Sequence, residues 1–360
     1  MVSAVYSPFT VRISPMERLF LINFEKDPDE MYMGFEPQWF DDASYGRGLR
    51  IIAWRTDGYV DVYQQPGLTE EEKLDVAGKG LGETFIRPMP DARFNVTRSG
   101  IDAAFAFEDK TGRAVDVTVV ERNRKPKKPF SLLAPVGSSS ANPTALPVYL
   151  MFEFDFVRRS RTDVTIRING RRHKPDTFPL PLNGSRVYFM RYSADTFLVD
   201  WCPEASSELA PLSGSGTTLR GPYGTLFELS DQHGHPAVAR IRADRAHHSF
   251  AAAFDPPVPD LSLIDDGTSL EGEFVLGAEA SAGVVRGTYH LHRSGSEVAA
   301  RLHPGGGWEP NPPTLFLKIL FRVAKIFRQW PKTYQWTATI TLPDREPPFM
   351  QSRWERVTSA

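Results

Sequence analysis

The chain has 360 residues, a hydrophobic content of 41% and a formal net charge of −2 at pH 7. This length suffices for two domains with buried cores, and a near-neutral chain is a poor match for nucleic acid as the principal partner. The single cysteine, Cys202, excludes an internal disulfide and a cysteine-based zinc cluster and is typical of a reducing compartment. The longest apolar run near the start, residues 19–22, is too short for a signal-peptide core of about 7 residues, so we expect a cytoplasmic protein.

A hairpin at residues 48–63 is the clearest strand signal. Asp57 and Gly58 form a strong two-residue turn signal. If these two residues are the loop, Trp54 pairs with Asp61, and period-two alternation separates two faces. One face carries Ile51, Ala53, Val60 and Val62. The other collects Ile52, Trp54, Tyr59, Asp61 and Tyr63. A face that mixes aromatic and acidic side chains is typical of the wall of a ligand site.

Three further stretches supply candidate site residues. A hairpin at 101–122, with its turn at 109–112, is expected to carry on one face Phe105, Phe107 and Asp116. In a strand at 149–157, alternation separates Phe152, Phe154 and Phe156 from Met151, Glu153 and Asp155. A strand through 185–192 adds Arg191. The expected ligand-binding residues are therefore Trp54, Tyr59, Tyr63, Phe105, Phe107 and Arg191.

A change of composition marks the predicted domain boundary. Residues 203–224 are rich in Ser, Gly, Pro and Thr, so we divide the chain near residue 210 into domains 1–210 and 211–360. In the first half, Asn169-Gly170 signals another two-residue turn. In the second half, residues 334–342 alternate between apolar and polar side chains, as in a half-buried strand.

Residues 314–330 form the one convincing amphipathic helix. At about 100° per residue, one stripe collects four cations: Lys318, Arg322, Lys325 and Arg328. The opposite side carries Phe316, Ile319, Leu320, Val323, Ile326, Phe327 and Trp330. The four cations exclude a membrane-spanning role. Two interpretations stay open: the apolar side packs on a barrel as a plug or flank, or the helix docks on an anionic membrane surface.

Many strands, hairpin connections and a single helix predict an all-β fold of two antiparallel lipocalin-like barrels or sandwiches. In length, strand density and lined faces such as Trp54, Asp61 and Tyr63, the chain resembles the two-domain lipocalin-like proteins that include carotenoid hydratases. This resemblance of architecture implies a protein that binds, or as an enzyme hydrates, a long isoprenoid.

Four carboxylates are candidates for acid–base catalysis: Asp61, Asp116, Glu153 and Asp155. A carboxyl group buried among aromatic rings has a raised pKa, which lets it act as a general acid toward an alkene or a carbonyl. The alternative is that Glu153 and Asp155 face solvent or pair with neighbouring arginines.

A histidine pair indicates a second candidate site. If Ser294 and Gly295 form the turn after Arg293, one face of the hairpin carries His290, His292, Glu297 and Arg301. Two histidines two residues apart with a nearby carboxylate can hold a divalent metal, a spacing similar to the first metal motif of cupins. The alternative is the polar exterior of a hairpin.

Three functions are therefore open from the sequence. The first is a protein that binds a hydrophobic small molecule, isoprenoid or lipid-like, in a β cavity and isomerises, hydrates or cyclises it without a cofactor. The second is a noncatalytic lipid carrier or interaction module, and the third is a metal-dependent cupin-like enzyme. Contact with an anionic membrane fits the cationic helix, and we expect no nucleic-acid partner.

Overall fold

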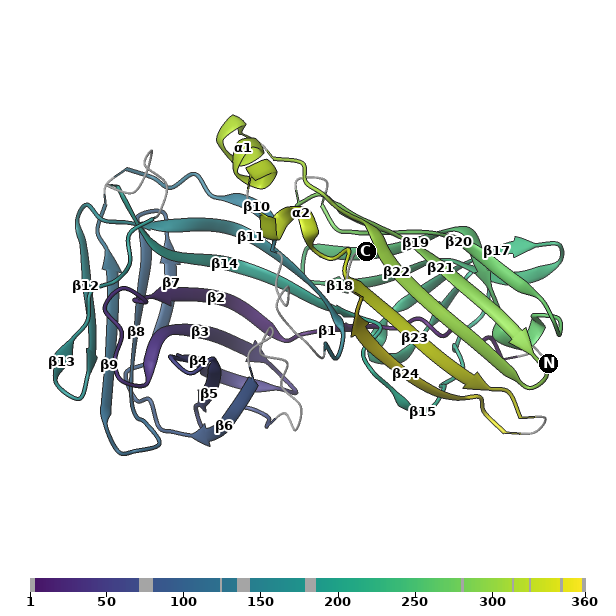
Figure 1. Cartoon of the computed structure of the whole chain (residues 1–360), viewed down its shortest axis with the longest axis horizontal. Coiled ribbons are helices and arrows are strands. Elements are labelled where there is room, and N and C mark those ends of the chain that lie inside the picture. The colour runs from purple at the N-terminus through teal and green to yellow at the C-terminus, as the bar shows by residue number, and fades with distance from the viewer. Residues whose placement is uncertain are drawn as a thin grey trace. The chain divides into compact units, whose positions relative to one another are not determined.

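The computed structural model describes residues 4–70, 80–123, 125–134, 143–178, 186–279, 282–312, 314–323, 325–343 and 346–357. The predicted all-β fold is confirmed (Figure 1). By internal contacts the chain forms two compact units. The N-terminal unit comprises Pro15–Ser131 and Met151–Phe197, and the C-terminal unit comprises Met1–Ser14, Leu132–Leu150 and Leu198–Ala360.

The first sheet of the N-terminal unit contains β2 (Met16–Asn23), β3 (Tyr32–Asp42), β4 (Gly46–Arg55), β5 (Tyr59–Gln64) and β6 (Gly80–Ile86). It also contains β10 (Phe130–Ala134), β11 (Leu146–Arg158) and β14 (Val187–Trp201), and the unit boundary falls within these three strands. The order is β10-β11-β14-β2-β3-β4-β5-β6. Neighbours from β14 to β5 pair antiparallel, whereas β5 and β6 run parallel.

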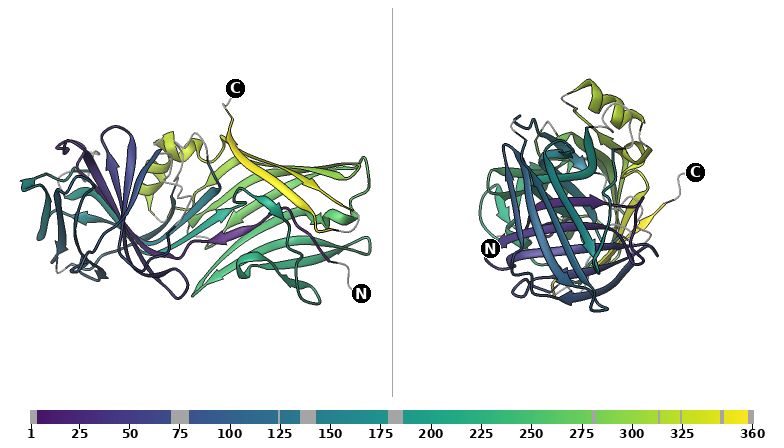
Figure 2. Two further views of the ribbon diagram at one scale, coloured as in Figure 1. Left: turned by 90° about the horizontal axis from the view of Figure 1, so that it is seen from below. Right: turned by 90° about the vertical axis from the view of Figure 1, so that its left-hand side faces the viewer.

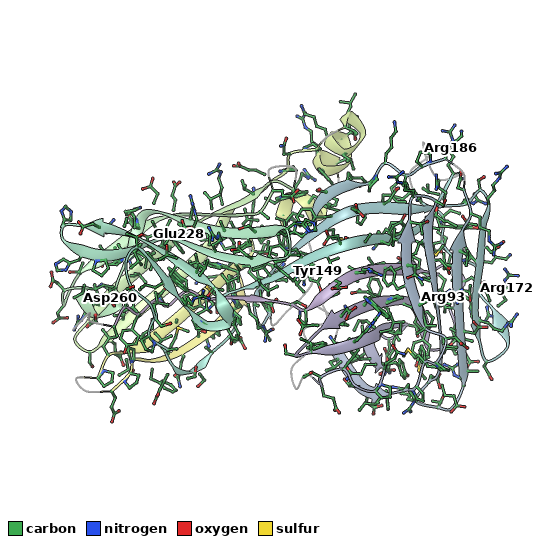
Figure 3. The ribbon with its side chains drawn as sticks, turned by 180° about the vertical axis from the view of Figure 1, so that it is seen from behind. Arg93, Tyr149, Arg172, Arg186, Glu228 and Asp260 are labelled. Carbon is green, nitrogen blue, oxygen red and sulfur yellow. The ribbon has the colours of Figure 1, made fainter. Side chains whose placement is uncertain are left out.

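The second sheet of this unit contains β7 (Arg93–Thr97), β8 (Gly100–Glu108), β9 (Ala114–Glu121), β12 (Thr162–Ile168) and β13 (Arg171–Arg172), in the antiparallel order β13-β12-β9-β8-β7. Its strands cross those of the first sheet (Figures 1 and 2). Arg172 on β13 and Arg93 on β7 lie on the two edge strands of the second sheet, as labelled in Figure 3.

The core of the N-terminal unit lies between these two sheets. Alternate residues of β4 and β8 supply one aromatic and aliphatic cluster because strand side chains point to opposite faces in turn. Phe35 from the first sheet packs edge-on against Phe105 from the second, with ring centroids 5.8 Å apart. Tyr63 stacks on Phe107 at 4.3 Å. The unit is thus a sandwich with an aromatic interior.

The C-terminal unit is built on one antiparallel sheet of ten strands. In sheet order these are β15 (Ser206–Glu208), β24 (Phe349–Arg356), β23 (Tyr334–Thr341), β22 (Glu297–Glu309), β21 (Val284–Ser294), β20 (Ser269–Gly277), β19 (His248–Pro259), β18 (His235–Arg245), β17 (Leu226–Gln232) and β16 (Thr218–Arg220). Short 3₁₀ turns occur at Pro222–Gly224 and Leu261–Leu263. The predicted half-buried strand is confirmed as β23, whose residues alternate between buried and more exposed positions.

Aromatic residues far apart in sequence fill the core of this unit. Phe9 is fully buried, and its ring stacks on Phe254 with centroids 5.3 Å apart. It also lies 5.7 Å from the ring of Trp336 and 6.1 Å from Trp201. The segment containing Phe9 continues into β1 (Val11–Ile13), which pairs with the end of β14.

Asp260 fixes the same N-terminal segment from the other side. Its carboxylate is buried and accepts the backbone N–H of Tyr6 at 3.1 Å (Figure 3).

The two units differ from the predicted division near residue 210. The boundary falls at Phe197 and Leu198, and Met1–Ser14 and Leu132–Leu150 belong with the C-terminal half. Phe9 illustrates this, because its buried ring packs on Phe254 and Trp336 of that half.

The predicted helix is present as α1 (Leu315–Val323) and α2 (Lys325–Gln329). Its buried side differs from the prediction: Leu317 and Phe321 are buried, whereas Ile319 and Val323 are exposed. The side chains of Phe316, Leu320, Lys325 and Ile326 lie outside the described residues. No helix in the described part of the chain is long and apolar enough to cross a membrane.

The register of β4 and β5 corrects the first predicted hairpin. Trp54 pairs with Val60 and Ala53 with Asp61, because three residues, Thr56–Gly58, form the loop in place of two. Gly58 has φ +88°, and its N–H bonds to the carbonyl of Arg55. This is the geometry of a turn that ends in a left-handed residue. The one-residue change moves Asp61 and Tyr63 to the face opposite Trp54.

The second predicted hairpin is also wrong by one residue. Glu108 pairs with Ala114, so the loop has five residues in place of four. The carboxylate of Asp109 organises it by accepting the N–H groups of Thr111 and Arg113 at 2.8 and 3.0 Å. As a result Asp116 lies opposite Ala106 and does not share a face with Phe105 and Phe107.

The predicted turn at Asn169-Gly170 and the predicted faces of the hairpin after Arg293 are confirmed. Ile168 pairs with Arg171 around a turn in which Asn169 and Gly170 both have positive φ, as a two-residue hairpin turn requires. In β21 and β22, His290 pairs with Arg301, which places the expected polar residues on one face. The buried opposite face carries Tyr289, Leu291, Val298, Ala300 and Leu302.

Candidate functional site

The face of the first sheet that lies opposite the aromatic core of the N-terminal unit is also largely buried. Backbone register arranges this face in transverse rows across five strands. Arg191 on β14 is paired with Leu21 on β2, Glu36 on β3 is paired with Ile52 on β4, and Ile52 is paired with Val62 on β5. The pairs Leu19 with Gln38 and Ile22 with Phe35 place Leu21 beside Glu36. We call this surface the Glu36 face.

Over β3, β4 and β5, the neighbouring rows make one end of the Glu36 face apolar and the other polar. At the apolar end Trp54 pairs with both Gly34 and Val60. A Cβ atom on Gly34 would lie 3.5 Å from the Trp54 ring, an ordinary contact, but only 3.1 Å from the carbonyl oxygen of Ile22, which is tight. At the polar end Gln38 pairs with Arg50, which pairs with Gln64. These three polar residues are all buried.

Glu36 is a carboxyl group on a largely apolar wall. It keeps partial solvent exposure, and its Oε1 accepts one hydrogen bond from Nε2 of Gln38 at 2.9 Å. Burial raises the pKa of Glu36 to about 7, although Gln38 and the charge of Arg191 act to lower it. A carboxyl group with this pKa exchanges its proton readily at neutral pH, because both its protonation states are populated.

Arg191 places a cation on the same face. Its guanidinium donates to Oδ1 of Asn23 at 2.9 Å and lies over the ring of Phe189 at 4.5 Å. Burial lowers the pKa of Arg191 to about 10, although Glu36 and Glu25 act to raise it. The pKa of Glu36 is raised and that of Arg191 is lowered, so for each group the cost of burying its charge outweighs the attraction of the opposite charge.

The arrangement has the parts of an acid–base site for an apolar molecule. Among the described contacts, Glu36 and Arg191 make no direct ion pair, and β2 separates their strands. Ile52 and Val62 belong to a buried apolar cluster beside the carboxyl group, and the partly buried Trp54 packs against that cluster. Arg191 and Gln38 offer hydrogen-bond donors that can orient a polar end of a ligand.

Asp61, the first predicted catalytic residue, lies on the opposite face and serves a different purpose. Its side chain has no exposed surface, and its carboxylate oxygens lie 3.2 Å from Arg55 Nη1 and 3.1 Å from Lys110 Nζ. The backbone N–H of Lys110 also donates to the hydroxyl of Tyr63 at 3.1 Å. An enclosed carboxylate with two cationic partners ties the loop after β8 to β5, which is a structural role.

Tyr63, a predicted ligand-binding residue, is part of the packed core. Its hydroxyl and that of Tyr32 form a hydrogen bond of 2.7 Å. Burial raises the pKa of both phenols, so both stay protonated at neutral pH. Phe105 and Phe107 are buried in the same cluster. These three rings fill the sandwich.

A cavity of about 380 Å³ opens near this buried cluster. It is lined by Glu30, Met31, Arg55, Thr56, Asp57, Thr111 and Arg113. Six of these seven side chains carry a charge or a hydroxyl group, which can hold the polar part of a small ligand. Tyr59, another predicted ligand-binding residue, is 52% exposed, and the Arg55 guanidinium lies 5.8 Å from its ring.

The two predicted carboxylates of β11 have separate environments. Glu153 is exposed and has a positive φ of 49°, so the strand alternation is interrupted there. Asp155 lies 3.4 Å from Lys127 Nζ, which also contacts Glu121 at 3.2 Å. Burial raises the pKa of Asp155, and Lys127 opposes this change. Asp155 thus belongs to an ion-pair cluster.

Asp116, the fourth predicted carboxylate, lies away from Glu153 and Asp155, opposite Arg167 on the outer side of the second sheet.

The predicted metal-binding face exists, but it does not form a compact ligand set. His290, His292 and Glu297 share a face of β21 and β22, as expected. Nδ1 of His292 is 2.8 Å from the hydroxyl of Ser269. In the described residues these three side chains do not bring their ligand atoms within 4.8 Å of one another. The arrangement matches the exterior of a hairpin.

Sequence reasoning identified Arg191 and Trp54 but missed Glu36 and Gln38. Both lie on β3, in a part of the chain whose many acidic residues are also typical of a solvated loop. The available signal was the pattern of apolar residues around them, with Phe35 and Phe40 buried on either side.

Searches with known protein-family models, curated proteins and solved structures find no match to this chain.

Proposed function

We propose that the N-terminal unit binds a hydrophobic small molecule, isoprenoid or lipid-like, on the Glu36 face and that Glu36 transfers a proton to and from it. The observation that carries the proposal is the position of Glu36. It is a partly exposed carboxyl group in one row with Leu21, Ile52 and Val62, and Arg191 lies at the end of that row. The predicted carboxylate Asp61 is enclosed.

The proposed chemistry is cofactor-independent and starts from the protonated carboxyl group. Glu36 gives its proton to one carbon of an alkene, whose π electrons form the new C–H bond and leave a cation on the other carbon. The resulting carboxylate then removes a neighbouring proton, which gives the isomer. If water adds to the cation instead, the carboxylate takes the proton that the water loses, which gives the alcohol. The π face of Trp54 can stabilise the intermediate cation.

Binding and turnover are tested separately. Purified protein would be extracted for bound lipid and titrated with a panel of isoprenoids and fatty acids, with native mass spectrometry as the readout. Trp54→Ala is expected to weaken binding by on the order of tenfold or more, because an aromatic surface is lost. Glu36→Gln is expected to keep binding and to reduce turnover by at least about 100-fold.

The matched control is Glu108→Gln, an exposed carboxylate of the same unit. It is expected to change neither binding nor turnover. A protein that carries no lipid and ignores the whole panel would refute the proposal. Binding without turnover in the wild type would refute the catalytic part and leave a carrier.

A further inference from the structure

The helix α1 exposes three large apolar side chains to solvent. Leu315, Ile319 and Val323 are 74%, 54% and 69% exposed. They are spaced four residues apart and so form one stripe along the helix. We call them the exposed stripe. Isolated exposed apolar residues are ordinary, but three large ones in one row on one short helix indicate a surface that a partner covers.

Different side chains, among those that the structure describes, hold the helix in place. Leu317 and Phe321 are buried, and the Phe321 ring contacts Trp308 of β22 at 5.0 Å. Phe327 of α2 lies 4.9 Å from Phe321 and 5.5 Å from Trp308. The hydroxyl of Thr314 accepts the N–H of Leu317 at the start of α1. The exposed stripe therefore has no part in anchoring the helix.

Cations border the exposed stripe on one side. At about 100° per residue, Lys318 and Arg322 lie within roughly 60° of Leu315 and on the side away from Val323. Both are exposed. Residues 310–333 contain no Asp or Glu. Every charged residue of this segment is therefore a cation, and this charge complements an anionic partner.

We infer that α1 docks on an anionic phospholipid membrane, with the exposed stripe at the acyl boundary and Lys318 and Arg322 at the phosphates. A narrow apolar stripe flanked by cations is the form of helix that lies in a membrane interface. α1 also projects beyond the strands of its own unit, as Figures 1 and 2 both show. A second copy of the chain fits poorly, because a self-complementary contact would bring like cations together.

Vesicle flotation tests the inference with the full-length protein. Vesicles of phosphatidylcholine with about one third phosphatidylserine are compared with vesicles of phosphatidylcholine alone. The wild type is expected to float with the anionic vesicles and to release them as salt rises. Lys318→Ala with Arg322→Ala is expected to reduce the partition constant about 30-fold, from the loss of two cations near an anionic surface. Ile319→Ser with Val323→Ser is expected to reduce it by on the order of tenfold or more.

Two control variants lie elsewhere on the same unit. Arg301→Ala removes an exposed cation of β22, and Leu263→Ser removes a side chain that is 40% exposed. Both are expected to float like the wild type. The inference is overturned if the wild type binds neither kind of vesicle, or if the α1 variants bind as well as the controls. It is also overturned if size-exclusion chromatography shows a dimer that the Ile319 and Val323 substitutions dissociate.

Discussion

Replacing Glu36 with glutamine should stabilise the protein in a way that depends on pH. The folded state raises the pKa of Glu36 from 4.5 to about 7. Below pH 4.5 the carboxyl group is protonated in both folded and unfolded states, so its full contribution to stability is present. As the pH rises toward 7, the unfolded state releases the proton first, and the free energy of unfolding decreases. Above pH 7 the loss is complete and amounts to about 3 kcal/mol.

Glutamine at position 36 cannot ionise and still offers an oxygen to Gln38. The free energy of unfolding of Glu36→Gln should therefore match that of the wild type near pH 4.5 and exceed it by about 3 kcal/mol near pH 8. Urea unfolding at both pH values measures this difference, and a carboxyl ¹³C NMR titration gives the pKa directly. Glu108→Gln is the control and should show no such dependence on pH. An equal change at both pH values would refute the reasoning, because it would mean that Glu36 is not desolvated.

Three further predictions concern other parts of the molecule. Arg191→Met should raise the pKa of Glu36 above 7 in the same NMR titration, because Arg191 now acts to lower it; an unchanged value would show that the two charges do not interact. Asp61→Asn should destabilise the protein by about 2–3 kcal/mol in urea unfolding, since two cations lose their enclosed partner, and a neutral result would contradict its structural role. Phe9→Ala should cost about 3–5 kcal/mol through the cavity left beside Phe254; a loss below about 1 kcal/mol would show that the N-terminal segment is dispensable to the core.

The sequence predicts the class of fold well because strand alternation and turn residues are local signals. The all-β fold, the Asn169-Gly170 turn and the strand from Tyr334 all follow from patterns of a few residues. What local patterns cannot supply is the number of residues in each loop. Asp57-Gly58 indicates a turn correctly, but the hydrogen bonds of that turn stabilise a loop of three residues. Gly58 N–H donates to the Arg55 carbonyl, and Tyr59 N–H donates to the Asp57 carboxylate.

Whether a register error is odd or even decides whether a site can be predicted, because only an odd shift moves side chains to the other face of the sheet. A one-residue error at each of the first two hairpins moved Asp61 away from Trp54 and Asp116 away from Phe105. At the hairpin after Arg293 the turn is Gly295-Ser296, one residue beyond the expected position, so the pairing shifts by two and His290 stays on its predicted face. Of the mixed face predicted around Trp54, only Ile52 stays on the same side of the sheet, and the carboxyl group that lies there is Glu36 of the other neighbouring strand.

The burial of Phe9 has a consequence for the order in which the C-terminal unit folds. Phe9 is synthesised early, yet its neighbour Trp336 follows more than 300 residues later. Contacts between such distant segments form slowly, because a long chain must close before they stabilise anything. A ribosome-bound chain therefore carries an unsatisfied apolar segment through most of its synthesis. The N-terminal sandwich, Pro15–Phe197 without residues 132–150, has all its strands in place much sooner, so we expect it to fold first and the C-terminal unit to close last.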